Sequence, residues 1–350
     1  MTAYTASIWR LLSVPPTRNL LEWVTRSHAI IFMLHRFQDQ ETGVEGHDPA
    51  ALDRLLTELR RRRYAFLDLE EMARSLIDAN GSSARRLRRT VAFTMDDGYE
   101  DQARVGGDLF GSHDCPVTLF AVTEFLDGTR WMWWDKIRYI VEKSARDLSR
   151  QSLAHGRGDA AIHNGTLKGS LTRRLVAEVH ALPEAERDPA LQALAEQAQT
   201  LLPPKPPRRF SAMTWEQARE LERTCMRFAP HTRTHPALDT VSDTRSREEI
   251  SGSWNRMRAE LSRPMPVLAY PYGRFQAKDE RAARDAGLLA AVADRSGINH
   301  PSRIHRNPRS RFRIRRVGLP DDPARSALYA SGLANVTDFL RSRGAVDTFA

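Results

Sequence analysis

Residues Val91 to Asp101 read VAFTMDDGYED. The run from Thr90 to Met95 is short, apolar and rich in strand-forming residues, so it predicts a β-strand. The pair Asp96-Asp97, followed by Gly98, stands where that strand ends. Because Asp and Gly both favour turns, this motif alone is typical of an ordinary strand exit.

A second polar cluster changes the interpretation. His231 and His235 lie four residues apart in the sequence HTRTH, directly after the strand-like run Met226 to Ala229. One carboxylate and two histidines can complete a three-ligand metal site that leaves a position open for water. The remaining aspartate of the first motif can then accept a proton from that water. Together the two motifs predict a metal-dependent hydrolase.

Predicted strands alternate with predicted helices along the chain. Short apolar runs predict buried strands, and apolar side chains at helical spacing predict the helices between them. The strands are expected at residues 29–34, 64–69, 90–95, 116–122, 226–229, 267–269, 288–293 and 312–317, and the helices at 48–62, 70–77 and 102–110, with Thr214 as the N-cap of another. This order predicts a mostly parallel sheet with right-handed crossovers, either open or closed into a barrel.

Four clusters stand at or shortly after the carboxyl ends of four of these strands. They are His35, the pair Asp96-Asp97, the segment His231 to His235, and the pair Tyr272-Gly273. In parallel α/β folds, ligands bind at the carboxyl ends of the strands. We therefore expect all four clusters at one edge of the sheet, around one site.

The alternation is interrupted between residues 131 and 209. This segment is rich in Ala, Leu, Glu and Arg, which predicts a helical insertion, and it closes with the proline-rich connector Leu202 to Arg209. Trp131, Trp133 and Trp134 open it. These tryptophans either form the core of the insertion or stack against carbohydrate.

Composition limits the class of protein. With 350 residues, 28% charged and 41% hydrophobic, the chain has the composition of a soluble globular protein. No apolar run reaches the roughly 18 residues of a membrane span, and Arg10, Pro15 and Arg18 interrupt what would be the apolar part of a signal peptide. Cys115 and Cys225 form neither a disulfide framework nor a CxxC motif. These features predict a cytoplasmic protein.

The net charge of +9 comes almost wholly from arginine, because only five of the 53 basic residues are lysines. Codon bias in a GC-rich genome produces such an excess, and so does selection for an anionic partner. The arginine runs at 60–63 and 85–89 accompany no nucleic-acid-binding module, so we predict no nucleic-acid partner. The N-terminal stretch Ile8 to Val24 either covers the bottom of the barrel, which we favour, or lies on an anionic membrane as a peripheral anchor.

Six segments resemble one known family. Thr94 to Gly98 is similar to a TFDDG motif, His231 to His235 to H-[ST]-x-x-H, and Leu268 to Gly273 to FAYPYG. Ile31 to Arg36 resembles a strand ending in LMYHR, Trp133 to Asp135 resembles a WWD signature, and Phe312 to Gly318 resembles the last strand, which often reads LPRIxV. The family is that of the polysaccharide deacetylases with a NodB homology domain, carbohydrate esterase family 4.

The resemblance implies an α/β fold, a distorted (β/α)7 barrel of the NodB type. The barrel would cover residues 28–320 and be interrupted by the helical insertion at 131–209. An N-terminal extension (1–27) would precede it and a C-terminal helical tail (321–350) would follow it. The resemblance says nothing of the oligomeric state.

The resemblance also implies roles for single residues. Asp97, His231 and His235 would bind a divalent ion, usually Zn²⁺. Asp96 would be the general base, and the backbone N–H of Tyr272 would stabilise the oxyanion. The implied reaction is the removal of N-acetyl groups from a saccharide.

Two departures from the family pattern concern residues around Asp96. Many members carry an arginine in the third motif that holds the catalytic aspartate, and Ala269 stands in its place. Asp96 must then be oriented by another cation, for which Arg274, Arg315 and Arg316 are the candidates.

The second departure is a missing histidine. The family's late motif usually supplies a catalytic histidine, but residues 296–299 read SGIN. His35 is the natural replacement as general acid, because it is expected at the same strand-end face.

The leading function is therefore metal-dependent N-deacetylation of an envelope glycan precursor, an oligosaccharide or a lipid-linked saccharide. The same fold can instead cleave another C–N bond or an O-acetyl ester. A catalytically silent glycan-binding protein is the third interpretation, because both departures affect catalytic groups.

Overall fold

The computed structural model describes residues 29–78, 87, 89–144, 146, 148, 167–295, 297 and 299–330. The chain divides into two compact units. One consists of the segment that ends at Asp127 and the segment that begins at Ala212, and the other is Gly128–Ser211. The expected N-terminal extension (1–27) and the tail beyond residue 330 lie outside the described residues.

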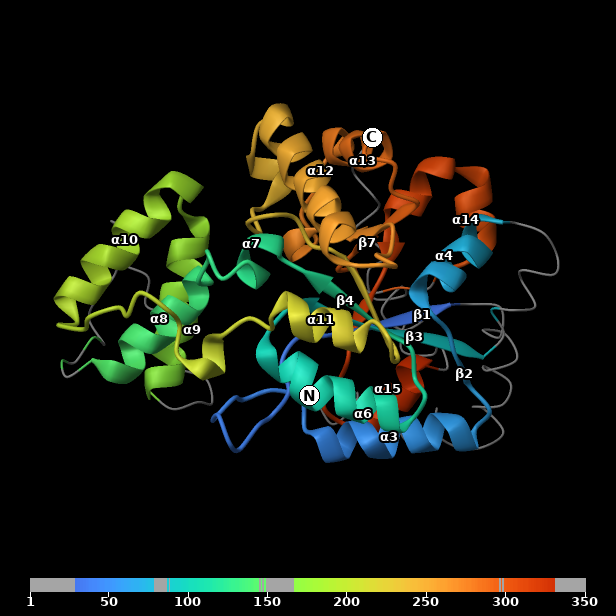
Figure 1. The fold of residues 1–350 in the computed structure, drawn as a ribbon, viewed down its shortest axis with the longest axis horizontal. Helices are drawn as coiled ribbons and strands as arrows, with labels where there is room; N and C mark the ends of the chain where they lie inside the picture. The colour runs from blue at the N-terminus through green and yellow to red at the C-terminus, as the bar shows by residue number, and fades with distance from the viewer. Residues whose placement is uncertain are drawn as a thin grey trace, which may run out of the picture. The chain divides into compact units, whose positions relative to one another are not determined.

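The first unit contains two sheets in which every strand pair is parallel (Figure 1). The strands are β1 (Ile30–Leu34), β2 (Ala65–Phe66), β3 (Thr90–Asp97), β4 (Val117–Ala121), β5 (Met226–Pro230), β6 (Val267–Ala269), β7 (Ala290–Ala293), β8 (Ile314–Arg315) and β9 (Val317–Gly318). The larger sheet has the order β5-β4-β3-β1-β9, with β2 beside β3, and the smaller has the order β6-β7-β8. The predicted parallel α/β fold is confirmed.

The chain changes sheets at Arg316. β8 pairs with β7 and β9 pairs with β1, so one segment links the two sheets. Between them, the Arg316 backbone N–H donates to the Ala293 carbonyl at 3.1 Å. The sequence predicts a single strand at 312–317, which is wrong, because the change of partner divides it. Counting β8 and β9 as one position, the strands follow in the series expected of a seven-stranded barrel.

β5 and β6 are the two ends of this series. Within the described residues they share no strand ladder, although the Met265 N–H donates to the Phe228 carbonyl at 2.7 Å. The fold is thus of the distorted barrel type.

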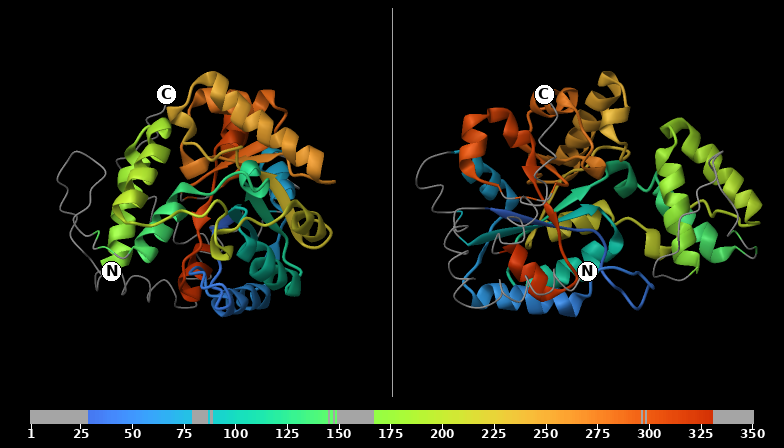
Figure 2. Two further views of the ribbon diagram at one scale, coloured as in Figure 1. Left: turned by 60° about the vertical axis from the view of Figure 1, so that its left-hand side comes forward. Right: turned by 180° about the vertical axis from the view of Figure 1, so that it is seen from behind.

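Helices cover the sheets on both sides. They are α3 (Pro49–Arg61), α4 (Leu69–Ile77), α6 (Gly107–Ser112), α7 (Thr123–Leu126), α11 (Trp215–Leu221), α12 (Asp243–Glu260), α13 (Ala277–Asp285), α14 (Pro301–Arg306) and α15 (Pro323–Ala330). α3, α6 and α15 lie on one side of the larger sheet, and α12, α13 and α14 lie on the opposite side, as both Figure 1 and Figure 2 show.

Local sequence explains several helix boundaries. Asp68 accepts from the Glu70 N–H at 2.8 Å and caps α4. Because the helix begins there, the strand predicted at 64–69 is shorter and consists only of β2. Thr214 and Gln217 form a capping box at the start of α11, as Thr214 predicts. The helix predicted at 102–110 begins instead as a π-helix, η1 (Gln102–Gly106), before α6.

Alternating side chains divide the core of this unit in two. Phe93 of β3 belongs to a cluster with the leucines of α3. Ala92 and Ala229 belong to another, which also contains residues of α4 and of the smaller sheet. Counting by twos, Asp96 lies on the side of Ala92, and His231 on the side of Ala229. Because side chains alternate between the two faces of a strand, the side chains of Asp96 and His231 both point into the space between the sheets.

The second unit consists of α8 (Trp133–Lys143), α9 (Leu167–Ala181), α10 (Glu184–Gln197) and the short 3-10 helix η2 (Arg208–Phe210). It has its own apolar core, against which Trp133 packs. Trp133 stacks on His180 with ring centroids 6.1 Å apart. These contacts favour a core role for Trp133 over a sugar platform. None of the helices in the described segments is both long and apolar enough to cross a bilayer.

Candidate active site

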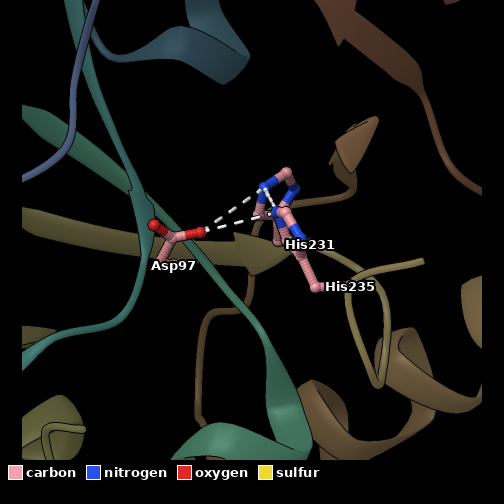
Figure 3. A group of neighbouring side chains, drawn as sticks. All are labelled: Asp97, His231 and His235. Carbon is pink, nitrogen blue, oxygen red and sulfur yellow. Dashed lines mark hydrogen bonds and ion pairs between the residues drawn. The ribbon is translucent and has the colours of Figure 1, made fainter. Parts of the chain in front are cut away.

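Asp97, His231 and His235 converge at the carboxyl ends of β3 and β5 (Figure 3). All three side chains are buried. His235 Nε2 lies 3.2 Å from His231 Nε2 and 3.6 Å from Asp97 Oδ1, and His231 Nε2 lies 4.0 Å from the same oxygen. The structure thus brings together the three residues for which the sequence predicts a metal site.

The orientation of His231 is fixed by the backbone of β6. Its Nδ1 is 2.8 Å from the carbonyl oxygen of Ala269, which can only accept, so Nδ1 carries the proton and donates. The Nε2 lone pair then points at Asp97 and His235. A histidine held in this way is preorganised as a metal ligand.

The dimensions of the cluster fit a divalent ion. Zinc bonds of about 2.0–2.1 Å in tetrahedral geometry place neighbouring ligand atoms roughly 3.4 Å apart. The three separations above lie around that value, and the ligand atoms are all within 4.8 Å of one another. Two imidazoles and one carboxylate suit zinc and related ions.

Electrostatics also favour a cation here. Burial raises the pKa of Asp97, and His35 and His231 offset that effect only in part. A bound cation would stabilise the ionised carboxylate that burial disfavours.

Four residues of the site that are not glycine adopt left-handed backbone angles. The φ angles are +86° at Asp97, +67° at Thr232, +62° at His235 and +58° at Tyr272. Such a conformation costs on the order of 1–3 kcal/mol per residue, and it concentrates at functional sites. Part of the geometry is supported locally, because Thr232 Oγ1 accepts from the His235 N–H at 3.1 Å.

Asp96 is buried beside this cluster and is held by Arg316. Arg316 Nη1 lies 2.6 Å from Asp96 Oδ1, and Nη2 lies 2.7 Å from Oδ2, which is a bidentate pair. Burial alone would raise the pKa of Asp96, but the positive charge and the hydrogen bonds of Arg316 hold it below its usual value. Asp96 is therefore an ionised acceptor, with Oδ2 4.0 Å from His231 Nε2.

Arg316 is thus the cation that orients Asp96, out of the three the sequence offers. Arg274 instead pairs with Asp239 at 2.9 Å. The sequence interpretation missed Asp294, whose Oδ1 lies 2.6 Å from Arg316 Nη2. Its position directly after β7 was the available signal, since the other site residues also follow strands.

Gln102 is a second residue that the motifs do not indicate. Its Nε2 donates to the carbonyls of His35 and Asp96, and its Oε1 accepts from the N–H groups of Gly98 and Tyr99 at 3.0 and 2.8 Å. The side chain is fully buried in η1. It therefore clamps the Asp-Asp-Gly turn to the end of β1.

His35 and Tyr272 lie at the same edge of the sheet. His35 follows β1, which pairs with β3, and its side chain is exposed. It is close enough for its charge to lower the pKa of Asp97 against the larger effect of burial. Tyr272 lies in the short turn η4 (Pro271–Gly273), with its ring against that of His235 at 4.6 Å.

The segment that replaces the family's late motif is only partly described, because residues 296 and 298 lie outside the described residues. Asn299 pairs with the backbone of Arg315, donating to its carbonyl at 2.8 Å and accepting from its N–H at 2.9 Å. This residue therefore has a structural partner in the strand next to Arg316.

Comparison with known proteins agrees with the motifs. Residues 191–291 match the model of the polysaccharide deacetylase family. The resemblance to the polysaccharide deacetylases is confirmed. The matched segment includes both histidines and Tyr272 but not Asp96 and Asp97. No curated protein sequence matches the chain.

Several solved deacetylases share the fold. A Streptococcus pyogenes deacetylase, PplD, in complex with acetate superposes with a TM-score of 0.56 at 16% identity, over 87% of this chain and 98% of its own. A de-N-acetylase from Aggregatibacter actinomycetemcomitans gives 0.52 at 14% identity, over 89% and 99%. A polysaccharide deacetylase from Bacillus cereus gives 0.50 at 13%, over 87% and 69%. At these identities the similarity shows the fold alone.

Proposed function

We propose that this protein is a metal-dependent hydrolase that removes N-acetyl groups from a saccharide. The observation that carries the proposal is the convergence of Asp97, His231 and His235 beside an Asp96 that Arg316 fixes in its ionised form. The match to the polysaccharide deacetylase family and the deacetylases among proteins of the same fold support this reaction class.

Each residue of the site has one role in the proposed reaction. Asp97, His231 and His235 hold the divalent ion, for which zinc is the best fit. When bound, such an ion lowers the pKa of water and polarises the acetamide carbonyl. Asp96 accepts the proton of the attacking water, and the backbone N–H of Tyr272 donates to the oxygen on which negative charge develops.

His35 completes the set as general acid. When the C–N bond breaks, the sugar amine needs a proton, because an amide anion is a very poor leaving group. His35 is exposed at the end of β1, beside the Asp-Asp-Gly turn that Gln102 ties to it. It can therefore meet a substrate from solvent.

The direct test is acetate release from a panel of N-acetylated oligosaccharides by the zinc-loaded protein. We expect release from at least one member, and none from the His231→Ala protein. Release only from O-acetylated esters would favour the alternative chemistry. A protein that binds one ion and the glycans, but releases no acetate from either panel, would be the silent glycan-binding protein.

The substrate proposal follows from the cytoplasmic setting that the sequence predicts. A short or lipid-linked N-acetylhexosamine precursor fits that setting better than mature wall polymer. We expect activity on such precursors and little on polymeric chitin or intact peptidoglycan. Activity confined to the insoluble polymers, or secretion of the protein, would contradict this part of the proposal.

A further inference from the structure

Glu249 lies on α12, and its side chain is completely buried. Its Oε2 accepts from the backbone N–H groups of Arg233 and Thr234 at 2.8 and 2.9 Å. Its Oε1 accepts from Thr234 Oγ1 at 2.7 Å and pairs with Arg245 Nη2 at 2.7 Å. One buried carboxylate therefore holds two consecutive peptide groups of a single loop.

That loop connects the two histidines of the candidate metal site. Arg233 and Thr234 lie between His231 and His235, and the residues on either side of them, Thr232 and His235, have φ angles of +67° and +62°. Such a turn is not a low-energy conformation for these residue types, so it must be held by its surroundings. The carboxylate of Glu249 supplies acceptors for N–H groups that this turn directs away from any regular ladder.

We propose that Glu249 is a positioning residue for the metal site and sets the separation of the two imidazoles through the backbone of Arg233 and Thr234. This inference rests on the proposed metal site. Figure 3 shows the two imidazoles side by side, both facing the carboxylate of Asp97. Without the carboxylate, the turn relaxes and the two Nε2 atoms no longer share one ion at ideal geometry.

The rest of α12 gives the helix other attachments. Ile250, Trp254 and Met257 are buried in the apolar core, and Ser242 caps the helix. A change at Glu249 is therefore expected to act on the loop more than on the helix. Glu248, one position earlier on the same helix, is exposed and provides a matched control.

The experiment compares the Zn²⁺ dissociation constants of the wild type, Glu249→Ala, Glu249→Gln and Glu248→Gln by competition with a chelating dye. Loss of a group that orients metal ligands typically weakens binding about 10–100-fold, which we expect for Glu249→Ala. Glutamine retains a carbonyl oxygen for the two backbone N–H groups, so Glu249→Gln should recover most of the affinity. Glu248→Gln should bind as the wild type does.

A second readout separates positioning from general stability. The visible absorption of the Co²⁺-loaded protein reports ligand geometry, and we expect it to change in Glu249→Ala and to return toward the wild-type spectrum in Glu249→Gln. Equal Zn²⁺ affinity and equal Co²⁺ spectra in the wild type and Glu249→Ala would overturn the inference.

If Glu249→Ala does not fold, Glu249→Asp takes its place, because the shorter side chain keeps the charge but withdraws it from the loop. Unchanged Zn²⁺ affinity in Glu249→Asp would then overturn the inference. A wild type that binds no ion in the same titration would overturn the metal site itself. If the wild type binds Zn²⁺ and the Glu249→Ala protein, or Glu249→Asp in its place, binds it equally well, only the role of Glu249 is overturned.

Discussion

Arg316 determines both the charge and the direction of Asp96. It contacts both carboxylate oxygens, and its charge keeps the pKa of Asp96 below the usual value although burial alone would raise it. For Asp97, burial outweighs the neighbouring histidines, and the pKa is raised. The surroundings thus move the pKa values of two adjacent carboxylates in opposite directions. Such a separation is typical of sites in which two acid groups have different roles.

The division of roles predicts different defects in the two aspartates. Asp96→Asn should keep the metal and lose on the order of 10²-fold or more in kcat, the usual loss for a general base. Asp97→Asn should lose the metal, because it removes a ligand. The metal content and the initial rates of the two purified variants test these two expectations. If Asp96→Asn loses the metal and Asp97→Asn keeps it, the roles are reversed.

The role of His35 predicts a dependence on the leaving group. His35→Ala should slow hydrolysis of an N-acetylated sugar much more than hydrolysis of an activated acetyl ester, whose leaving group needs little protonation. Rates on both substrates, compared with those of the exposed-surface variant His305→Ala, provide the measurement. Equal losses on amide and ester would mean that His35 only positions substrate.

The charge of Arg316 predicts a change in the pH profile. Asp96 must be ionised to accept a proton, so activity falls as the pH drops through its pKa. Arg316→Lys replaces a bidentate contact by a point charge, which lets burial raise that pKa. The acidic limb of kcat/KM should therefore move to higher pH, while Arg315→Lys leaves it in place. An unmoved limb in Arg316→Lys would show that Arg316 does not set the ionisation of Asp96.

The π-helix η1 begins with the buried side chain of Gln102. Its Nε2 donates to the Asp96 carbonyl in β3 and to the carbonyl of His35, the residue that follows β1. π-Helices are rare and are often found at functional sites. The element therefore joins the strand that carries His35 to the strand that carries Asp96 and Asp97.

Removal of this clamp should cost stability. Gln102→Leu has similar volume but leaves two N–H groups and two carbonyls without their partner, so we expect the free energy of unfolding to fall by about 2–4 kcal/mol. Urea denaturation gives the value, and Asp108→Asn on the exposed face of α6 is the control. A loss of unfolding free energy equal to that of Asp108→Asn would show that Gln102 does not stabilise the Asp-Asp-Gly turn.

At the scale of the molecule, the sequence predicts the parallel α/β series because each strand is a compact apolar run. It does not reveal that residues 314–318 serve two sheets, since partner choice depends on contacts far along the chain. For the same reason it could not choose among Arg274, Arg315 and Arg316. Gln102 and Glu249 resemble ordinary polar helix residues until folding buries them.

We propose that an ion held by Asp97, His231 and His235 is required for deacetylation by this protein. The most direct measurement is acetate release from an N-acetylated oligosaccharide by chelator-stripped protein as Zn²⁺ is added back. We predict no release from the stripped protein, and release that rises in proportion to bound ion and saturates near one ion per chain. Full activity in the stripped protein, or saturation with the ion without any acetate released, would contradict this proposal.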